Sequence, residues 1–378
     1  MVRLRIHKPL VHQLSMRYLL IVPVLLSVSA AVLLAVHGDV NTPLLYSQCH
    51  SRSRIPEISR IPVLGAPACF VVSLFMYAAA SIRGITQLSV IVSFTSALLT
   101  VCRVEAARLC NRPSWNIRVP TPSWLTFNLV GGTFVWDLWI LPVFLRRAKD
   151  LRIERVKADA LAGGQGTTGN VLEEEDRIMG ERSLATSADV WAIPLAVAIG
   201  FVLPSALMLV HTDPISVIVW LFFPLWVAVV QRAINFVVSR LLRDNGPLYL
   251  ESHTASLTLV YALPFVASLL THALFIWDLF WKDNSREMTR MALKFIGVDF
   301  VFIAATVLYW VLVESGIMPA ALLVLFTVFL GPGAALCLTW LVREKAICSF
   351  AVWDGQDVSD EESDGDGSTV HEYTPLVN

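Results

Sequence analysis

Nine long apolar runs determine what this chain can fold into. They cover residues 18–36, 61–80, 85–101, 124–145, 190–210, 215–230, 257–277, 295–313 and 317–341. A helix needs about 20 apolar residues to cross the roughly 30 Å hydrocarbon core of a bilayer. The runs therefore predict an all-α fold, a polytopic transmembrane helix bundle with eight or nine spans.

The number of spans depends partly on the first run. Its basic, acid-free leader resembles a signal peptide, and residues 28–30 form a weak cleavage site. The apolar run is longer than the usual 7–15 residues of a signal peptide, which favours a retained signal anchor. A possible tyrosine sorting signal at residues 373–376 would require a cytosolic C-terminus and so an even number of spans if the N-terminus is also inside. The sequence leaves eight and nine spans both open.

The composition supports a membrane protein. Apolar residues make up 56% of the chain and charged residues only 16%, whereas soluble domains have about 25% charged residues. A soluble protein could not cover so much apolar surface. After Trp353 the chain has eight acidic residues and no lysine or arginine. Such a segment is typical of a disordered, solvated tail.

These features divide the chain into four parts. Residues 1–145 hold the first four spans, 146–189 form a polar loop, 190–342 hold the remaining spans, and 343–378 form an acidic, disordered tail. The glycine-rich run at 163–169 lies in the polar loop. It lacks the lysine of a phosphate-binding loop, so we interpret it as a flexible linker.

Common cofactor and nucleic-acid motifs are absent from the sequence. The six cysteines form no CxxC pair and no zinc-type cluster with histidine. There is no GxSxG elbow, no HExxH pair and no dinucleotide-binding glycine motif. No basic, aromatic-interleaved patch indicates nucleic-acid binding. We therefore expect no metal, no cofactor and no nucleic-acid partner.

A short sequence occurs twice. Residues 134–139 read Phe-Val-Trp-Asp-Leu-Trp, and residues 275–280 read Phe-Ile-Trp-Asp-Leu-Phe. In a nine-span model the two copies run in opposite directions, as in the inverted repeats of transporters. Alternatively, their aromatic residues belong to an interfacial belt and their acids face water.

Several acids fall within or at the ends of the predicted spans. Charged groups inside a bilayer cost roughly 2.5–3.5 kcal/mol, so they usually face a partner or a cavity. A carboxyl group in an apolar site can keep its proton and act as an acid. The candidate catalytic acids are Asp137, Asp278, Asp299 and Glu314. The aromatic side chains that could stabilise a carbocation are Trp136, Trp139, Trp277, Trp281 and Trp310.

The layout resembles a known family. A chain of under 400 residues with about eight spans, the two Trp-Asp segments, a polar central loop and an acidic tail is similar to the fungal membrane-bound terpene cyclases of ascofuranone-type and paxilline-type clusters. The resemblance implies cyclisation of a prenylated, often epoxidised, intermediate, started by protonation and without a metal. The lack of an aspartate-rich DDxxD motif in the apolar body agrees with that. The site residues above come from burial alone and not from the resemblance.

We therefore hypothesise a membrane-embedded terpene cyclase acting in terpenoid, meroterpenoid or indole-diterpene biosynthesis. Its partners would be a lipophilic prenylated substrate and membrane lipids, and its location the endoplasmic reticulum or another endomembrane. The same intramembrane acids and the repeat would also suit a proton-coupled transporter. A receptor or scaffold that binds partners through the acidic tail is a third interpretation.

Overall fold

The computed structural model describes residues 10–37, 65–162, 182–241, 246–250, 253–283 and 285–344. Most of these residues are helical, and none of them forms a strand; isolated bridges join Leu184 to Arg108 and to Leu248. The all-α prediction is confirmed for this part of the chain. The basic leader before residue 10, the glycine-rich run at 163–169 and the acidic segment after Trp353 lie outside the described residues.

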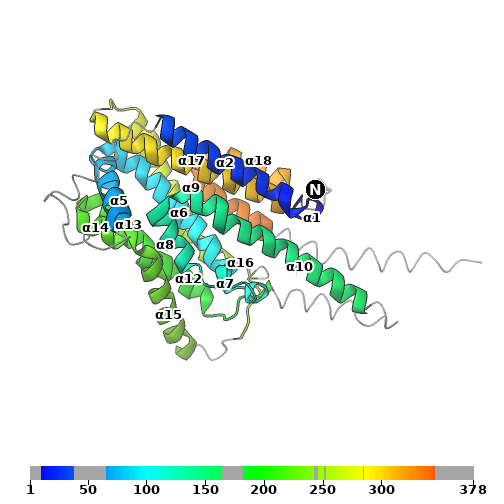
Figure 1. The fold of residues 1–378 in the computed structure, drawn as a ribbon. Coiled ribbons are helices and arrows are strands. Elements are labelled where there is room, and N and C mark those ends of the chain that lie inside the picture. Colours follow the sequence, from blue (N-terminus) through cyan, green and yellow to red (C-terminus); the bar gives the residue numbers. More distant parts are fainter. Residues whose placement is uncertain are drawn as a thin grey trace, which may run out of the picture.

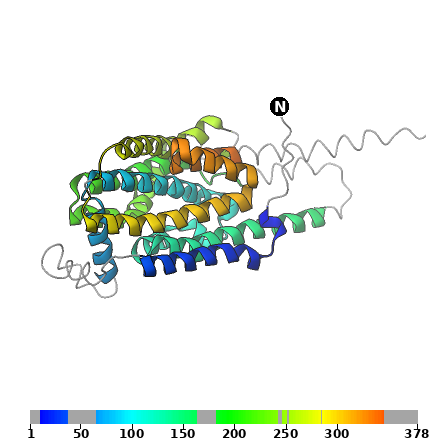
Figure 2. The same cartoon turned by 90° about the horizontal axis from the view of Figure 1, so that it is seen from above.

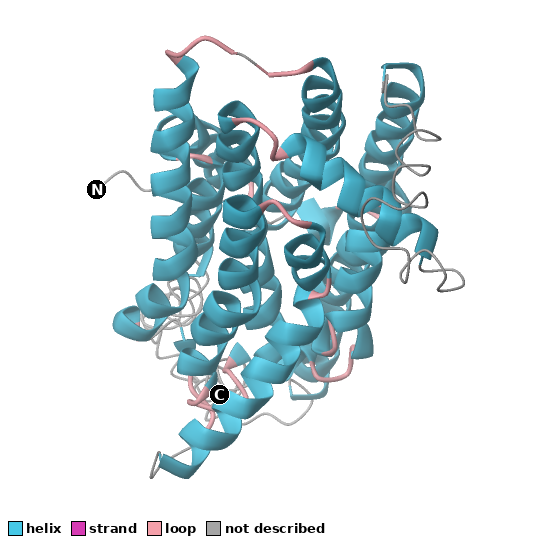
Figure 3. Ribbon diagram, turned by 90° about the vertical axis from the view of Figure 1, so that its left-hand side faces the viewer, coloured by secondary structure: helices cyan, strands magenta, loops and turns pink. Residues whose placement is uncertain are grey.

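The helices pack side by side as a bundle, with loops at its two ends (Figures 1 and 3). In chain order they are α1 (Leu10–Gln13), α2 (Met16–His37), α5 (Gly65–Ala78), α6 (Ile82–Ala107), the 3₁₀ turn η2 (Leu109–Asn111), α7 (Trp115–Arg118), α8 (Thr121–Val130), α9 (Gly132–Val135), the π-helical turn η3 (Trp136–Ile140), α10 (Leu141–Ala162), α12 (Asp189–Val197), the π-helical turn η4 (Ala198–Val202), α13 (Leu203–His211), α14 (Pro214–Leu221), α15 (Phe223–Leu241), α16 (Thr254–Leu279), α17 (Glu287–Ser315) and α18 (Ile317–Leu330). A further helix covers residues 332–344.

Helix α6 lies at the centre of the bundle. It packs along α16 and also contacts α12 and α17. Two thirds (67%) of its most apolar window is buried in the protein, against 22% for α2. Helix α2 lies at the periphery, where it packs on α17 (Figure 2). Protein therefore covers α6 far more completely than α2.

The outer surface of the bundle is strongly apolar. Val36, Phe280 and Phe329 are 68%, 84% and 70% exposed. Large apolar side chains exposed in such number would be costly in water. They are compatible with helices whose outer faces contact lipid.

The helices agree with the predicted apolar runs in position but not all in length. Five are long and apolar enough to cross a membrane: Met16–Val36, Ile82–Ala107, Asp189–His211, Thr254–Leu279 and Glu287–Ser315. A sixth crossing results if α14 and α15, which meet at a 59° bend, form one broken span. The runs at 61–80 and 317–341 contain α5 and α18, which have only 14 residues each. Eight or nine crossings are therefore not confirmed.

The predicted fourth run, 124–145, is interrupted. Gly131 has φ +134°, a conformation that L side chains rarely adopt, and it separates α8 from α9. The helix then continues through η3 into α10, which extends to Ala162. The first 17 residues of the predicted polar loop are thus helical, and α10 projects beyond the rest of the bundle (Figure 1). The helix therefore continues from its apolar part through the charged residues that follow.

A second π-helical turn marks a close helix crossing. At Gly200 in η4, a Cβ atom would lie 2.6 Å from the backbone nitrogen of Val227 in α15. Small residues at helix crossings let two backbones approach closely in apolar surroundings. Gly200 therefore sets the distance between η4 and α15.

We predict that Gly200→Ala lowers the free energy of unfolding by about 1–3 kcal/mol, because the backbone of α15 must move away. The matched control is Gly297→Ala in α17, where a Cβ would meet only the flexible Gln87 side chain at 3.3 Å. Unfolding in mixed detergent micelles measures both variants. Equal stabilities for the two variants would show that the crossing at Gly200 tolerates a side chain.

Candidate active site

Asp137 occupies an unusual position in the bundle. It lies in η3, the π-helical turn Trp136–Ile140, and its side chain is fully buried. Neither carboxyl oxygen meets a donor at hydrogen-bonding geometry. Single π-helical turns within α-helices occur often at functional sites. A buried carboxyl group without a donor is costly, so its presence calls for a reason beyond stability.

The other buried acids of the described residues are all paired. Asp189 accepts from Thr186 Oγ1 and Asn235 Nδ2, each at 2.8 Å. Glu105 and Glu344 accept hydrogen bonds from arginine side chains, and Asp278 does so too. Asp137 is the exception among them, which makes it the first candidate for a chemical role.

The carboxyl group of Asp137 faces helix α17. Its electrostatic neighbours there are Thr306 and Asp299. The Thr306 hydroxyl donates to the Phe302 carbonyl at 2.7 Å, and Thr306 itself is buried. The polar surroundings of Asp137 are therefore a hydroxyl group and a second acid.

Asp299 holds α17 against the helix break at Gly131. Its Oδ1 accepts from the Thr133 N–H at 3.0 Å, and its carbonyl accepts from Thr133 Oγ1 at 2.8 Å. A Cβ on Gly132 would lie 2.7 Å from Asp299 Oδ2, so glycine is needed for this approach. The carboxyl group satisfies a backbone N–H that the break leaves without a helical partner. The contacts of Asp299 indicate a positioning role.

Tryptophans surround η3 on its buried side. The Trp136 and Trp310 rings are 6.0 Å apart between centroids, and neither is more than 1% exposed. Trp124 lies 6.3 Å from Trp136, and Trp340 lies 4.7 Å from Trp310. Two of the five predicted tryptophans, Trp136 and Trp310, are thus brought together at the Asp137 turn. Ring faces of this kind can stabilise a cation in an apolar site.

Of the other three predicted tryptophans, Trp139 lies in η3 itself, whereas Trp277 and Trp281 lie at the end of α16. Trp277 and Trp281 are 67% and 64% exposed at the end of α16, and Trp139 is 39% exposed. Exposed tryptophans at helix ends are typical of an interfacial belt. The rings of Trp277 and Trp281 are therefore not part of the buried group around η3, and the Trp139 ring lies on the partly exposed side of that turn.

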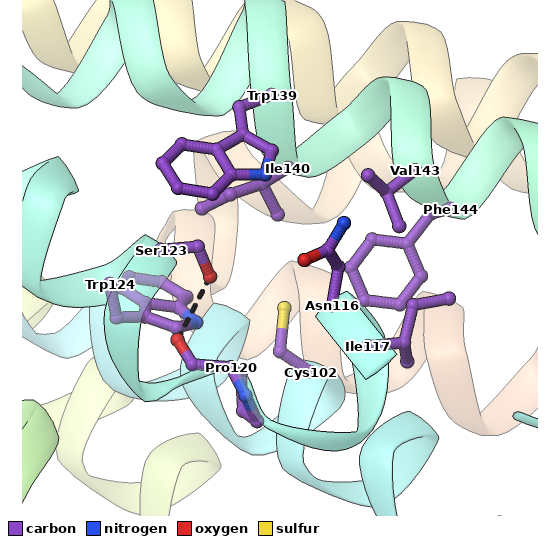
Figure 4. A pocket seen from close by; sticks show the side chains of 10 residues that line it. All are labelled: Cys102, Asn116, Ile117, Pro120, Ser123, Trp124, Trp139, Ile140, Val143 and Phe144. Atoms are coloured by element: carbon purple, nitrogen blue, oxygen red, sulfur yellow. Dashed lines mark hydrogen bonds between the residues drawn. The ribbon is translucent and has the colours of Figure 1, made fainter. Parts of the chain in front are cut away.

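A small cavity adjoins η3 (Figure 4). Trp139 and Ile140 of η3 line it together with Trp124, Phe144 and Cys102, and its volume is about 10 Å³, roughly the room for one water molecule. Ser123 Oγ, also on its wall, donates to the Pro120 carbonyl at 2.9 Å. A larger ligand at η3 would require α7 and α8 to move away from α10.

The second copy of the Trp-Asp repeat has a different environment. Asp278 Oδ2 accepts from Arg83 Nε at 3.1 Å and from Thr86 Oγ1 at 3.1 Å. The Arg83 side chain also donates to the Trp281 carbonyl at 3.0 Å. Asp278 therefore joins the end of α16 to the start of α6, whereas Asp137 has no such partner. The two copies are similar in sequence but have different structural roles.

Glu314 belongs to a buried ion cluster at one end of the bundle. It accepts from Trp310 Nε1 at 2.8 Å and from Arg343 Nη2 at 2.7 Å. The cluster consists of Glu105, Arg108, Arg182, Glu314, Arg343 and Glu344. Burial by itself would lower the pKa of the Arg343 guanidinium, but the carboxylates of Glu314, Glu344 and Glu105 outweigh burial and raise it. Glu314 is thus neutralised by a permanent cation.

This cluster corrects one boundary of the sequence analysis. Arg343 and Glu344 were assigned to the acidic tail, yet the Glu344 side chain is 0% exposed and pairs with Arg108 at 2.8 Å. The last helix at 332–344 is therefore anchored in the bundle through its final residues. The pairing joins residues 236 positions apart, so sequence spacing gave no sign of it.

Comparison with known proteins identifies the family. The model of the CtvD domain matches residues 62–278, which is more than half of the chain. The chain belongs to the CtvD domain family. This family is associated with biosynthetic gene clusters, which is consistent with a secondary-metabolite pathway. No curated protein and no solved structure matches the chain.

The CtvD match includes Asp137 and ends on Asp278, while Asp299, Thr306 and Glu314 in α17 lie beyond it. The polar neighbours of Asp137, Asp299 and Thr306, therefore lie outside the matched segment, although Asp137 itself lies inside it. Within the described residues no group of three or more His, Cys, Asp or Glu side chains is placed to hold a metal ion.

Sequence reasoning missed two residues of this CtvD-family site. Thr133 and Thr306 are ordinary residues in apolar surroundings, and only the packing of α17 on α9 brings them to the acids. For Thr306 the sequence does contain one indication, its spacing from two predicted site residues. Asp299, Thr306 and Trp310 are spaced 7 and 4 residues apart and so share a helix face.

We predict opposite stability effects at two buried acids. Asp137→Leu should raise the free energy of unfolding by about 1–3 kcal/mol, because it removes a buried polar group that has no donor. Glu344→Gln should lower it by about 3–5 kcal/mol, because it breaks a buried ion pair and leaves arginine charge uncompensated. Thermal unfolding in detergent compares the two, and a loss of stability in Asp137→Leu would show that Asp137 is structural.

Proposed function

We propose that this CtvD-family protein is a membrane-embedded, multi-pass terpene cyclase. It would protonate a lipophilic, prenylated and epoxidised intermediate and so start its cyclisation. The observation that carries the proposal is the Asp137 carboxyl group, buried without a hydrogen-bond donor beside the edge-to-face rings of Trp136 and Trp310. The family's association with biosynthetic gene clusters supports it.

In this mechanism Asp137 is the proton donor. Its proton passes to the epoxide oxygen, the adjacent C–O bond breaks, and the bonding electrons go to that oxygen. The resulting carbocation is attacked by the π electrons of a nearby alkene, which forms the ring. Loss of a proton from the last cation returns the proton, so the product is an isomer of the substrate. The reaction neither consumes nor supplies electrons.

The neighbouring residues have distinct roles in this proposal. Trp136 and Trp310 present ring faces to the cation, which an apolar site stabilises poorly without them. Asp299 positions the η3 turn through Thr133 rather than meeting the substrate. Asp278 and Glu314 hold helix ends together, because each accepts from an arginine.

The substrate class follows from where the acid lies. A group within the bundle, reached through apolar helices, suits a substrate that partitions into lipid. A prenyl chain supplies both the apolar surface and the alkenes that cyclisation needs. Such chemistry fits a protein of the endoplasmic reticulum or another endomembrane, with bilayer lipids around it.

The test is conversion of a prenylated aromatic epoxide by membranes that contain the protein. Mass spectrometry should detect a product of unchanged mass and altered retention time. Asp137→Asn should lower its formation 10²–10⁴-fold, the usual contribution of a general acid. The matched control is Asp213→Asn, since Asp213 caps α14 in a loop and asparagine caps equally well.

Equal product formation by wild-type protein and Asp137→Asn would remove Asp137 from the mechanism. Absence of any cyclised product from the wild-type protein would contradict the cyclase itself. If the protein instead moves a solute across vesicles, and that flux stops when the pH gradient is dissipated, then the acids serve proton-coupled transport.

A further inference from the structure

A groove lies on the outside of the bundle, away from Asp137. It has a volume of about 600 Å³ and is formed by α2, the start of α6 and α17. Its walls include Leu33, Arg83, Gln87, Arg290, Val301 and Phe302. One part of the lining is cationic and another is apolar. The proposed cyclisation mechanism uses none of these residues.

The cationic part carries an excess of positive charge. Arg83, Arg290 and Lys294 line it together with the acid Asp283, and a second acid, Asp278, pairs with Arg83 from outside the lining. Arg83 is held in place, because Nε donates to Asp278 and Nη2 donates to the Trp281 carbonyl. A guanidinium has five N–H groups in a rigid plane, so these two contacts leave others to bind an anion.

Arg290 is free to change partners. Its pair with Asp283 has a distance of 3.3 Å, and the two side chains are 60% and 37% exposed. An ion pair so open to solvent contributes little to stability. An incoming anion can therefore compete with Asp283 for Arg290 at small cost.

The apolar part faces the outside of the bundle. Leu33 on α2 and Val301 on α17 are 38% and 59% exposed. Gly297 lies between the two parts and adds no side chain to the groove. A Cβ there would lie 3.3 Å from Gln87 Nε2. A hydrocarbon chain can lie along this wall while its head reaches the arginines.

Exposed aromatic residues mark the level of the groove in the bilayer. Trp277, Phe280 and Trp281 at the end of α16 are 67%, 84% and 64% exposed. Tryptophan gathers at the boundary between hydrocarbon and headgroups. Since the Trp281 carbonyl accepts from Arg83, the cations of the groove lie close to this boundary.

We propose that the groove binds an anionic phospholipid of the surrounding membrane. The phosphate would contact Arg83 and Arg290, and an acyl chain would lie along Leu33 and Val301. Phosphate suits a pair of guanidinium groups because each can donate two parallel hydrogen bonds. A bilayer lipid is favoured over a soluble anion because the wall next to the cations is apolar and exposed at the side of the bundle. The proposal does not depend on the cyclase activity.

Native mass spectrometry of the purified full-length protein tests it. The protein is titrated in detergent with dioleoyl phosphatidylglycerol, dioleoyl phosphatidylcholine and oleate. We expect phosphatidylglycerol to bind more tightly than phosphatidylcholine, and Arg290→Gln to weaken phosphatidylglycerol binding about five-fold. The matched control is Arg286→Gln, an exposed arginine one turn before Arg290 that does not line the groove.

Each other outcome would overturn the proposal. Equal binding of phosphatidylglycerol and phosphatidylcholine would show that the arginines do not select an anion. Equal losses in Arg290→Gln and Arg286→Gln would place the lipid elsewhere on the surface. Tight binding of oleate without retention of phosphatidylglycerol would assign the groove to a lipophilic carboxylic acid instead of a phospholipid.

Discussion

The contact between Asp299 and Thr133 is the interaction on which the candidate site depends. Gly131 breaks the fourth apolar run, and the break leaves backbone N–H groups without helical partners in apolar surroundings. Such groups must find a partner within the protein. The Asp299 carboxyl group supplies one, and Thr133 returns a hydrogen bond to the Asp299 carbonyl. This exchange fixes α17 against α9 and so places Thr306 and Trp310 beside η3.

The distribution of buried charge separates structural acids from a chemical one. Glu314 and Glu344 are neutralised by arginines, and the cluster that they form ties the last helix to α6 and α17. Removing one partner from such a cluster is costly because it leaves a bare charge. Asp137 has no arginine partner, and its polar neighbours are the Thr306 hydroxyl and Asp299. Proteins keep groups of this kind at functional sites, where stability is given up for reactivity.

The two Trp-Asp segments show that similar sequences can have different structural roles. At Asp278 the helix is about to end, so the carboxyl group reaches Arg83 on the next helix in space. At Asp137 the helix continues through a π-helical turn, and the side chain points into the bundle. The tryptophans that precede the two acids differ in the same way: Trp136 is buried, while Trp277 is exposed. Four identical residues in a six-residue segment therefore did not predict a matching environment.

The sequence by itself determined the helical class, the approximate position of each helix and the short set of acids to consider. Apolar runs impose these features because backbone groups in apolar surroundings must hydrogen-bond within the segment. It also named Trp136 and Trp310 among five tryptophans for a common site, and the packing of η3 on α17 places these two rings 6.0 Å apart. Helix lengths could not be predicted in the same way, since the break at Gly131 and the bend between α14 and α15 arise from local geometry. Only the tertiary structure decided which acid is left unpaired. Pairing joins residues as distant as Arg108 and Glu344, and the energy of a buried charge depends on what lies across the helix interface rather than along the chain.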